Sequence, residues 1–559
     1  MPSATPSPAW DGRRPATGTE AEATALLGWL TDPEAPRLCL VTGAPGSGKT
    51  ALLGWFAKHG PRAGRPRRRT ARVLVPLAGQ SALGATWTIA DRLGVVARAP
   101  GDLVHALATS EARPAGRPVL LLTDLHAAAE PAALTELIAE LAGVGRVRLV
   151  VEARSGTPAP AALRTDRRVA VVDLDGDPDA VVAGAPERDR PLPDLSDPVA
   201  VCTADPLHVT TAYVTGAAAA GLPGTLDGPE EPARPGENAA EDHGGLRAAW
   251  MRAGQSLCRE QAPAERALVL LSALGDGADP RLRPALAELA EGAAWRLRWA
   301  RHRGDLTPPW PGPVTVLGAA GGPLEGTLLV GDRTGAVRLL HEADASPAGR
   351  LAHTVPGRVT ALAPAPDGTV LLLDDRGRLH TVRGTAPRAP YLERLTEAVS
   401  TTLARHPGTA LAAIAGSVVV GDRLGSVHAF GLRGLHQAAS HSGRVTAVSA
   451  VESETPFVCS GGVDGTVRLW TPGRDPRPEP LAERPSPVVS LHATETPHGP
   501  LVAVAWGDGL VELHRPEGGR TLSFRPGPPV RAVAVTGAGS LLIGTDESLV
   551  CLAPKRSSP

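Results

Sequence analysis

Residues 43–50, read as Gly-Ala-Pro-Gly-Ser-Gly-Lys-Thr, have the residue types and spacing of a loop that binds phosphate. Glycines at these positions let the backbone curl so that successive N–H groups point toward one anion. The ammonium of Lys49 can reach phosphate oxygens, and the hydroxyl of Thr50 is an oxygen ligand that Mg²⁺ accepts. The residues expected to contact the ligand are Gly43, Ala44, Pro45, Gly46, Ser47, Gly48, Lys49 and Thr50.

Such a loop needs a strand before it and a helix after it, and the sequence supplies both. The apolar run Leu38–Thr42 predicts the strand, and Lys49–Lys58 predicts a helix with one apolar side. A helix that begins at the loop adds unpaired N–H groups and a dipole that favours anions. This context favours a phosphate site over the alternative, a glycine-rich turn before an ordinary helix.

A second apolar run ends in the acid that such a site requires. Val119–Thr123 is followed by Asp124, whose carboxylate would hold Mg²⁺ through a water molecule. Aspartate after a strand is also a common turn residue, but its pairing with the loop Gly43–Thr50 favours the metal role.

Short apolar strands alternate with helical stretches over residues 21–225, which predicts an α/β domain with a largely parallel sheet. The strands expected are Leu38–Thr42, Arg72–Leu77, Pro118–Thr123, Val147–Glu152 and Arg168–Asp173. Residues 1–20 predict a disordered tail, residues 226–243 a flexible linker, and residues 244–305 a helical arm.

The order of these elements resembles the STAND class of signal-transducing P-loop NTPases, relatives of the AAA+ proteins, in a bacterial form with high-GC composition. Gly12-Arg13-Arg14 and the helix Ala21–Leu30 resemble the N-terminal segment of that family. Arg148–Arg154 resembles its sensor strand, and Ala204–Leu207 resembles its lid motif. The resemblance implies a P-loop NTPase domain over residues 21–225.

Two residues take their roles from this resemblance alone. Arg154 would lie near the γ-phosphate as a sensor, and Pro206 would pack near the adenine ring. Each has an alternative, because Arg154 also fits a solvated arginine at the end of a strand and Pro206 the first residue of a helix. With Thr50 and Asp124 at the metal, the resemblance implies ATP and Mg²⁺ as ligands and a homo-oligomer that forms when nucleotide binds.

The segment after Asp124 departs from the family pattern. Where the family carries a second acidic pair that polarises the attacking water, this chain has Ala127 and Ala128. The general-base contribution of about 10²–10⁴-fold should then be missing, so we expect an ATPase that is slow at most. Glu130, or His126, is the candidate substitute base, although either would project from a different position.

Arginines crowd into residues 62–72, which read RAGRPRRRTAR. We expect a solvated loop, with a contact to a partner protein as the second interpretation. Nucleic acid comes third, because no aromatic residue interleaves with the arginines to stack on bases.

Residues 306–554 repeat a unit of short β-runs separated by tight turns, from Val314–Leu340 through Val399–Phe430 to Val530–Leu552. The turn glycines Gly335, Gly377, Gly425, Gly465 and Gly509 recur at intervals close to the ~40–45 residues of a WD40 blade. The region resembles a WD40-like all-β propeller of about six blades.

The fourth unit carries the fullest resemblance to a WD40 repeat. In that family a buried hydrogen-bond relay joins four side chains, which here would be Asp464, His441, Ser460 and Trp470. The last unit ends at Leu552 without an outer strand, so we expect a strand within Arg296–Arg303 to complete it and close the ring.

Composition narrows the class of protein. The chain has 559 residues with 57 basic and 58 acidic side chains, so its balanced charge makes a nucleic-acid partner unlikely. No stretch approaches the ~18 apolar residues of a membrane span, and five scattered cysteines predict neither disulfides nor a zinc site. We expect a cytoplasmic protein that is not bound to a membrane.

Two functions fit this organisation. The first is an ATP-binding signal-transduction switch, in which the propeller docks a partner protein and nucleotide controls conformation or assembly. The alternative is a protein-interaction scaffold whose nucleotide site is vestigial or purely structural. No Ser/His/Asp or Cys/His arrangement supports an ordinary enzyme with its own small-molecule substrate.

Overall fold

The computed structural model describes residues 19–59, 72–109, 118–165, 168–175, 193–219, 242–303, 314–351, 355, 357–365, 367–382, 390–414, 416–432, 434–453 and 456–555. Almost all of the predicted tail and linker, the segment Gly12–Arg14, and the arginine run up to residue 71 lie outside these residues. The chain divides into two units. Unit 1 contains residues 1–193 and 204–228, and unit 2 contains residues 194–203 and 229–559.

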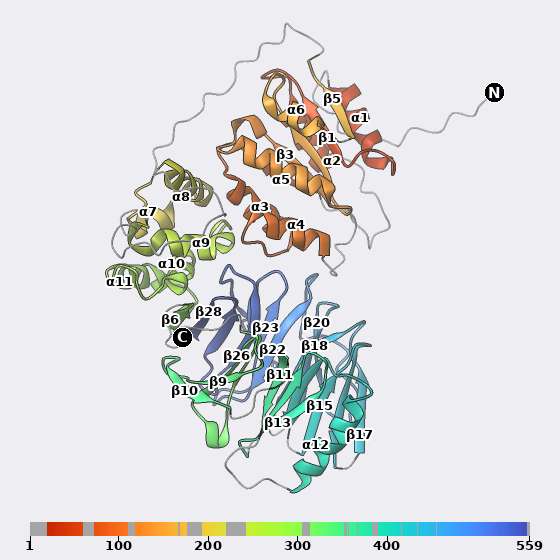
Figure 1. The fold of residues 1–559 in the computed structure, drawn as a ribbon, viewed down its shortest axis with the longest axis vertical. Coiled ribbons are helices and arrows are strands. Elements are labelled where there is room, and N and C mark those ends of the chain that lie inside the picture. The colour runs from red at the N-terminus through yellow and green to blue at the C-terminus, as the bar shows by residue number, and fades with distance from the viewer. Residues whose placement is uncertain are drawn as a thin grey trace, which may run out of the picture. The chain divides into compact units, whose positions relative to one another are not determined.

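Unit 1 is built on a five-stranded sheet whose paired strands all run parallel, in the order β2-β3-β4-β1-β5 (Figure 1). Its strands are β1 (Leu38–Thr42), β2 (Arg72–Pro76), β3 (Val119–Thr123), β4 (Arg148–Glu152) and β5 (Val169–Asp173). Each of the five strands expected from the sequence is therefore present. The α/β class of this part of the chain is confirmed.

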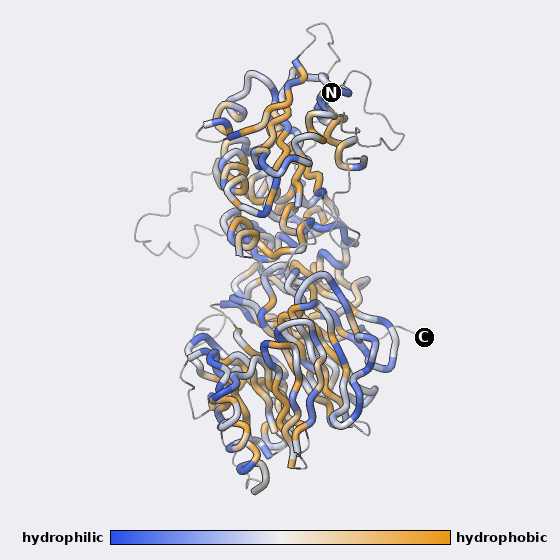
Figure 2. Tube along the Cα trace, turned by 90° about the vertical axis from the view of Figure 1, so that its right-hand side faces the viewer, coloured by the Kyte–Doolittle hydropathy of each residue, from blue (hydrophilic) through white to orange (hydrophobic). Residues whose placement is uncertain are grey.

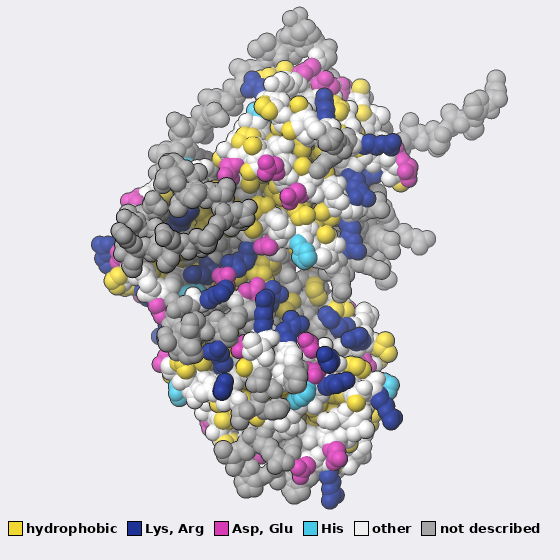
Figure 3. All heavy atoms as spheres, viewed as in Figure 1, with side chains coloured by type: hydrophobic (Ala, Val, Ile, Leu, Met, Phe, Trp, Pro, Cys, Tyr) yellow, Lys and Arg dark blue, Asp and Glu magenta, His cyan; other side chains and the backbone are white. Residues whose placement is uncertain are grey.

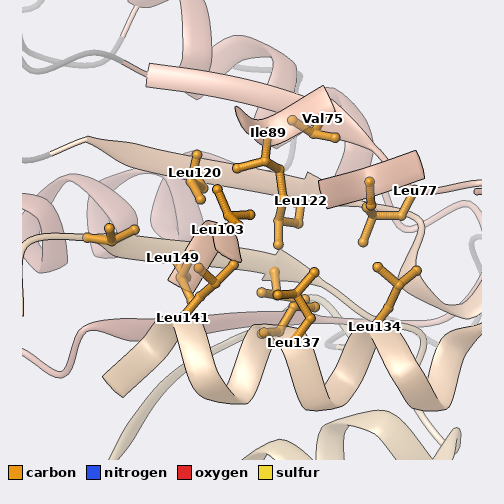
Figure 4. Close-up of a cluster of buried hydrophobic side chains, with 14 of the residues drawn as sticks. Val75, Leu77, Ile89, Leu103, Leu120, Leu122, Leu134, Leu137, Leu141 and Leu149 are labelled. Carbon is orange, nitrogen blue, oxygen red and sulfur yellow. The ribbon is translucent and has the colours of Figure 1, made fainter. Parts of the chain in front are cut away.

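Side chains alternate between the two faces of this sheet, because successive residues of a strand point in opposite directions. Leu38 and Leu40 of β1 join one apolar core, while Cys39 and Val41 join the other. The first core is completed by α3 (Ala82–Leu93), α4 (Pro100–Thr109), α5 (Pro131–Gly143) and α6 (Pro158–Arg164) (Figure 4). The second is completed by α1 (Glu20–Thr31) and α2 (Lys49–His59).

Unit 2 begins with helices. They are α7 (Pro198–Thr203), α9 (Leu246–Leu257), α10 (Pro263–Ala273) and α11 (Leu282–Leu289). Helix α7 lies within residues that the sequence assigned to the N-terminal domain, but it packs on α10, where Arg266 donates to the carbonyl of Cys202 at 2.7 Å. The helical arm also ends earlier than residue 305, because Trp295–His302 forms strand β6.

The rest of unit 2 is a ring of six sheets, so the predicted count of six blades is confirmed (Figure 1). The first three blades consist of β7 (Val316–Ala319), β8 (Thr327–Gly331), β9 (Val337–His341) and β10 (Pro347–Arg350); β11 (Val359–Pro364), β12 (Val370–Asp374) and β13 (Leu379–Val382); and β14 (Ala410–Ile414), β15 (Ser417–Gly421), β16 (Ser426–Gly431) and β17 (Gly434–Ala439). The last three consist of β18 (Val445–Val451), β19 (Phe457–Gly462), β20 (Thr466–Trp470) and β21 (Ala482–Glu483); β22 (Val488–Thr494), β23 (Leu501–Trp506), β24 (Val511–His514) and β25 (Leu522–Phe524); and β26 (Val530–Val535), β27 (Leu541–Thr545) and β28 (Ser548–Pro554) with β6. Hydrophobic stretches of the trace alternate with hydrophilic ones through both units, as expected when strand interiors are buried and turns are exposed (Figure 2).

Strand β6 closes the ring. It pairs antiparallel with β28, with Ala300 opposite Val550, and forms the fourth strand of the last blade. The closing strand predicted within Arg296–Arg303 is therefore confirmed. It covers the edge of β28, which would otherwise offer unpaired N–H and C=O groups to other chains.

The third repeat begins later than the sequence indicated. Val399 does not start a strand, because it lies in α12 (Pro390–Leu403), and the first strand of the blade is Ala410–Ile414. The helix packs against β13, β15 and β16, and Leu395, Val399 and Leu403 are buried in the core between the second and third blades. The buried apolar residues of this segment recur every four positions, a spacing that fits a helix. The strand predicted to begin at Val399 was therefore wrong.

The helical arm packs directly on the propeller within unit 2. Ser256 of α9 donates to the carbonyl of Arg525 at 2.9 Å, and Lys555, which follows β28, donates to the carbonyl of Ala290 after α11 at 3.1 Å. At Gly527 an added Cβ would lie 2.6 Å from the Cα of Ala253, so only glycine allows this approach of the helix. The arm and the propeller therefore form one body.

Candidate functional site

The glycine-rich loop leaves the carboxyl end of β1 and leads into α2. Strand β1 lies between β4 and β5, so the chain returns to either side of it, and ligands of open α/β sheets bind at such a point. A Cβ at Gly43 would lie 2.5 Å from Ser47 Oγ, and Gly46 and Gly48 have φ of 79° and 88°. The loop conformation therefore requires glycine at these three positions.

Lys49 turns back into the loop and is only 5% exposed. Its Nζ donates to the carbonyl of Gly43 at 2.9 Å, to that of Ala44 at 2.6 Å and to Ser47 Oγ at 3.2 Å. Burial lowers the pKa of this ammonium, while the carboxylates of Glu152 and Asp175 oppose the shift. A buried cation thus faces the concave side of the loop.

Arg154 follows β4 with an exposed side chain. Its positive charge acts on Lys49 and contributes to the lowered pKa of that ammonium. The structure therefore brings Arg154 near Lys49, and its role as a sensor of the γ-phosphate stays a prediction.

A carboxylate not anticipated from the sequence meets Thr50. Glu152, the last residue of β4, is 2% exposed and accepts the Thr50 hydroxyl hydrogen at 2.9 and 3.0 Å from its two oxygens. The backbone N–H of Asp124 also donates to this carboxylate. Burial, followed by the negative charge of Asp124, raises the pKa of Glu152 to about 7. Glu152 therefore links the two residues predicted to hold the metal.

Asp124 itself has an unusual backbone. It follows β3 with φ 57° and ψ 37°, a left-handed conformation that aspartate adopts more readily than most residues, and it precedes the short helix η1 (Leu125–Ala127). Non-glycine residues in this region cost about 1–3 kcal/mol and concentrate at functional sites. Asp124 therefore lies beside Glu152, the carboxylate that accepts the Thr50 hydroxyl hydrogen, and its role at a metal stays a prediction.

Asp175 is the second residue that sequence reasoning missed. It follows β5, and its carboxylate accepts the N–H of Ala44 at the start of the loop. A phosphate that used this N–H would have to displace Asp175. The only sequence signal for Glu152 and Asp175 was an acid near the end of an apolar strand, which is too common to single out either residue.

Glu130 is not directed at the loop. Its Oε2 accepts the N–H of Ala82 at 2.9 Å and so caps the N-terminus of α3. Ala127 is tied to the same neighbourhood, because its carbonyl accepts the N–H of Gly79. No observed contact therefore supports Glu130 as a substitute base.

Pro206 occupies the first position of α8 (Pro206–Ala219), where Asp205 accepts the N–H of Leu207 at 3.0 Å. The helix packs on α3, and Thr211 donates to the carbonyl of Gly79 after β2, the strand at the edge of the sheet farthest from β5. These contacts fit the helix-start interpretation, and the adenine role of Pro206 stays a prediction.

The side chains that the structure describes do not form a metal site by themselves. Within the described residues no cluster of three or more His, Cys, Asp or Glu side chains is arranged to hold an ion. A divalent cation between Thr50 and Asp124 would therefore need oxygens from a bound phosphate to complete its ligands.

The fourth blade contains a buried polar relay. His441, whose side chain is fully buried, contacts Asp464 at 3.1 Å and Thr466 at 3.0 Å through Nδ1 and Ser460 at 2.9 Å through Nε2. Trp470 was predicted to be its fourth member, but its indole N–H donates to the carbonyl of Arg474 at 2.9 Å. The relay thus connects His441, Asp464 and Ser460 as expected, with Thr466 added and Trp470 outside.

Comparison with known protein families identifies this repeat. Residues 435–471 match the family model "WD domain, G-beta repeat". The propeller therefore contains a WD40 repeat. The match begins in β17 of the third blade and ends after β20 of the fourth, so one sequence repeat contributes to two neighbouring blades. The same offset explains why β6, which precedes the first blade, completes the last one.

Solved structures resemble the chain at low sequence identity. The WD40 β-propeller domain of Doa1 is 12% identical, covers 47% of this chain and 98% of its own, and has a TM-score of 0.33. The computationally designed Ika8 protein is 18% identical, covers 42% of this chain and 69% of its own, and has a TM-score of 0.27. No curated protein matches the sequence. None of the helices in the described part of the chain has the length and apolar character that a membrane crossing requires.

Proposed function

We propose that unit 1 binds ATP with Mg²⁺ at the loop Gly43–Thr50. The observation that carries this proposal is the arrangement of the loop at the end of β1, with the buried ammonium of Lys49 turned into it and α2 beginning at Lys49. Glycines, inward cation and helix N-terminus together favour the β- and γ-phosphates of a nucleotide. We also propose that unit 1 is a STAND-like P-loop NTPase domain, because the order of its elements resembles that class.

Mg²⁺ would be held by Thr50 directly and by Asp124 through water. A hydroxyl has one hydrogen to donate and two lone pairs to offer. Because Thr50 donates its hydrogen to Glu152, its lone pairs are left for a cation. Glu152 is thus a positioning residue, and bound Mg²⁺ would supply charge neutralisation for the phosphates.

We propose that hydrolysis is slow. Ala127 and Ala128 offer no carboxylate to the attacking water, and Glu130 is engaged at the start of α3. The carboxylate of Glu152 is directed at Thr50, which suits it to hold a metal ligand rather than to activate water.

The WD40 propeller belongs to a class that generally mediates protein–protein interactions. We propose that it docks a partner protein and that nucleotide bound to unit 1 controls conformation or homo-oligomer assembly. The family resemblance supports this switch, as does the single body formed by arm and propeller.

A titration of the full chain with a fluorescent ATP analogue tests nucleotide binding. Lys49→Ala should abolish Mg²⁺-dependent binding, because the variant loses the cation that faces the phosphates. Lys58→Ala is the matched control, since Lys58 lies on the same helix but is exposed. Equal affinity in wild type and Lys49→Ala would refute the proposal.

The second candidate is a scaffold with a vestigial nucleotide site. The scaffold function is favoured by Asp175, whose carboxylate accepts the N–H of Ala44, because a negative charge there opposes the approach of phosphate. Sedimentation of the chain without nucleotide, with ADP and with Mg·ATP separates the two functions. The switch predicts a different sedimentation coefficient with Mg·ATP, and the scaffold predicts three identical values.

A further inference from the structure

Arginines line one face of the propeller across its first four blades. They belong to the turns between second and third strands and to the loops that lead into first strands, and we call them the arginine arc: Arg333, Arg358, Arg376, Arg423 and Arg444. All five side chains belong to exposed residues. In the described part of the chain none of them forms an ion pair.

Pairing of the strands puts these arginines on the same face. In the second blade Val359 lies opposite Asp374, so Arg358 and the turn that contains Arg376 share one end of the sheet. The turn of each blade packs on the loop that enters the next one. At Gly425 an added Cβ would lie 2.0 Å from the carbonyl oxygen of His441 and 2.9 Å from that of Gly443.

The turn carboxylates beside the arc are directed inward and are already engaged. Asp374 accepts the N–H groups of Arg376 and Arg378 with one oxygen, and its other oxygen contacts His380 at 2.9 Å. Asp422 repeats this arrangement in the next blade, with His428 at 2.9 Å. Among the described residues of these turns and loops, Asp375 is the one exposed acid. The arc therefore presents positive charge to solvent.

An apolar side chain stands within the arc. Leu424, next to Arg423, is 86% exposed, the largest exposure among the large hydrophobic side chains that the structure describes. The neighbouring part of this face, at the fifth and sixth blades, is covered by α9, where Ser256 and Ala253 meet Arg525 and Gly527. The arc thus occupies the part of the face that the helical arm leaves open. Lys and Arg side chains gather over the propeller in the view of Figure 3.

We propose that the arginine arc docks an acidic segment of a partner protein that carries an apolar side chain opposite Leu424. Guanidinium groups recognise carboxylates bidentately, and arginine is enriched among the residues that contribute most to binding at protein interfaces. A protein partner is favoured over nucleic acid, because the arc has no aromatic side chain to stack on bases and the chain has a net charge of −1. The inference rests on the proposed docking role of the propeller and is independent of nucleotide binding.

Fluorescence anisotropy with a labelled synthetic peptide tests this surface in the full chain. The probe is a repeat of Glu-Glu-Leu, compared with a Lys-Lys-Leu repeat and with a single-stranded oligonucleotide of similar length. The arc variant Arg376→Glu/Arg423→Glu reverses two charges of the arc, one in the turn of the second blade and one next to Leu424 in the turn of the third. Its matched control, Arg350→Glu/Arg474→Glu, reverses two exposed arginines on the outer strand β10 and after β20.

We expect the acidic peptide to bind, to lose about tenfold or more in affinity in the arc variant, and to bind the control variant as it binds wild type. Binding should weaken between low and high salt, since exposed charges are screened. Equal weakening in both variants, tighter binding of the oligonucleotide, or no peptide binding at low salt would overturn the inference. Lys49→Ala should bind the peptide normally, so failure of the nucleotide site and failure of the arc are separate results.

Discussion

Replacement of Glu152 by glutamine gives a pH-dependent prediction that follows from the geometry of the site. The carboxylate is 2% exposed beside Asp124, and its pKa is raised from 4.5 to about 7. Glutamine has the shape of the protonated acid and keeps an oxygen for Thr50. The substitution should therefore remove the cost of ionising this group in the folded protein.

The sign and size of the change in stability follow from the linkage between proton binding and folding. The folded state holds the proton of Glu152 more tightly than the unfolded state does. The contribution of Glu152 to stability is therefore greatest below pH 4.5 and is lost as the pH rises through about 7. A shift from 4.5 to about 7 corresponds to about 3 kcal/mol at 1.36 kcal/mol per unit. Glu152→Gln should thus stabilise unit 1 by about 3 kcal/mol at pH 8 and by about 1 kcal/mol or less at pH 5.

Hydrogen exchange measured by mass spectrometry supplies the assay, because peptides from β1 and β4 report on unit 1 separately from the propeller. Exchange free energies would be compared for wild type and Glu152→Gln at both pH values without nucleotide. Glu130→Gln is the control, since this acid caps α3 and is not part of the buried pair. A stability difference that is the same at pH 5 and pH 8 would refute the reasoning about Glu152.

Three further predictions concern the propeller. His441→Ala should destabilise it by about 2–3 kcal/mol in calorimetry, because three buried contacts are lost, while the exposed Ser442→Ala should not. Gly425→Ala should lower the melting temperature of the propeller more than Gly434→Ala does. Both glycines have positive φ, but only at Gly425 would an added Cβ also meet a carbonyl oxygen. Equal effects would contradict the close packing of the turn on the loop. Leu403→Ala should lower the free energy of unfolding in urea by about 2–4 kcal/mol, because Leu403 is buried in the core, and the exposed Glu397→Ala should change it by almost nothing. Equal effects of the two substitutions would contradict the packing of α12 in the core.

Local patterns in the sequence predicted most elements of the fold. The strands of unit 1 are apolar runs bounded by turns, so their positions were predictable to within a residue, as with β1 (Leu38–Thr42). The closing strand β6 was predictable because a blade without an outer strand leaves an edge. Helix α12 was not, since the apolar spacing around Val399 fits either type of element.

The site depended more on contacts between distant segments. Lys49 and Thr50 were predictable because one contiguous loop contains both. The meeting of Glu152 with Thr50 depends on the pairing of β4 with β1, where Glu152 lies opposite Val41. The contact of Glu130 with Ala82 was not predictable for the same reason, because it follows from the fold and not from the distance of Glu130 to Asp124 along the chain.

The most direct test of the nucleotide site is the nucleotide retained by the full chain after incubation with Mg·ATP and gel filtration, with ATP and ADP separated by chromatography. The proposal predicts that wild type and Lys58→Ala retain nucleotide, mostly as ATP, and that Lys49→Ala retains almost none. Retention of ADP alone would contradict slow hydrolysis. If wild type retains no more than Lys49→Ala, the loop Gly43–Thr50 is not a nucleotide site.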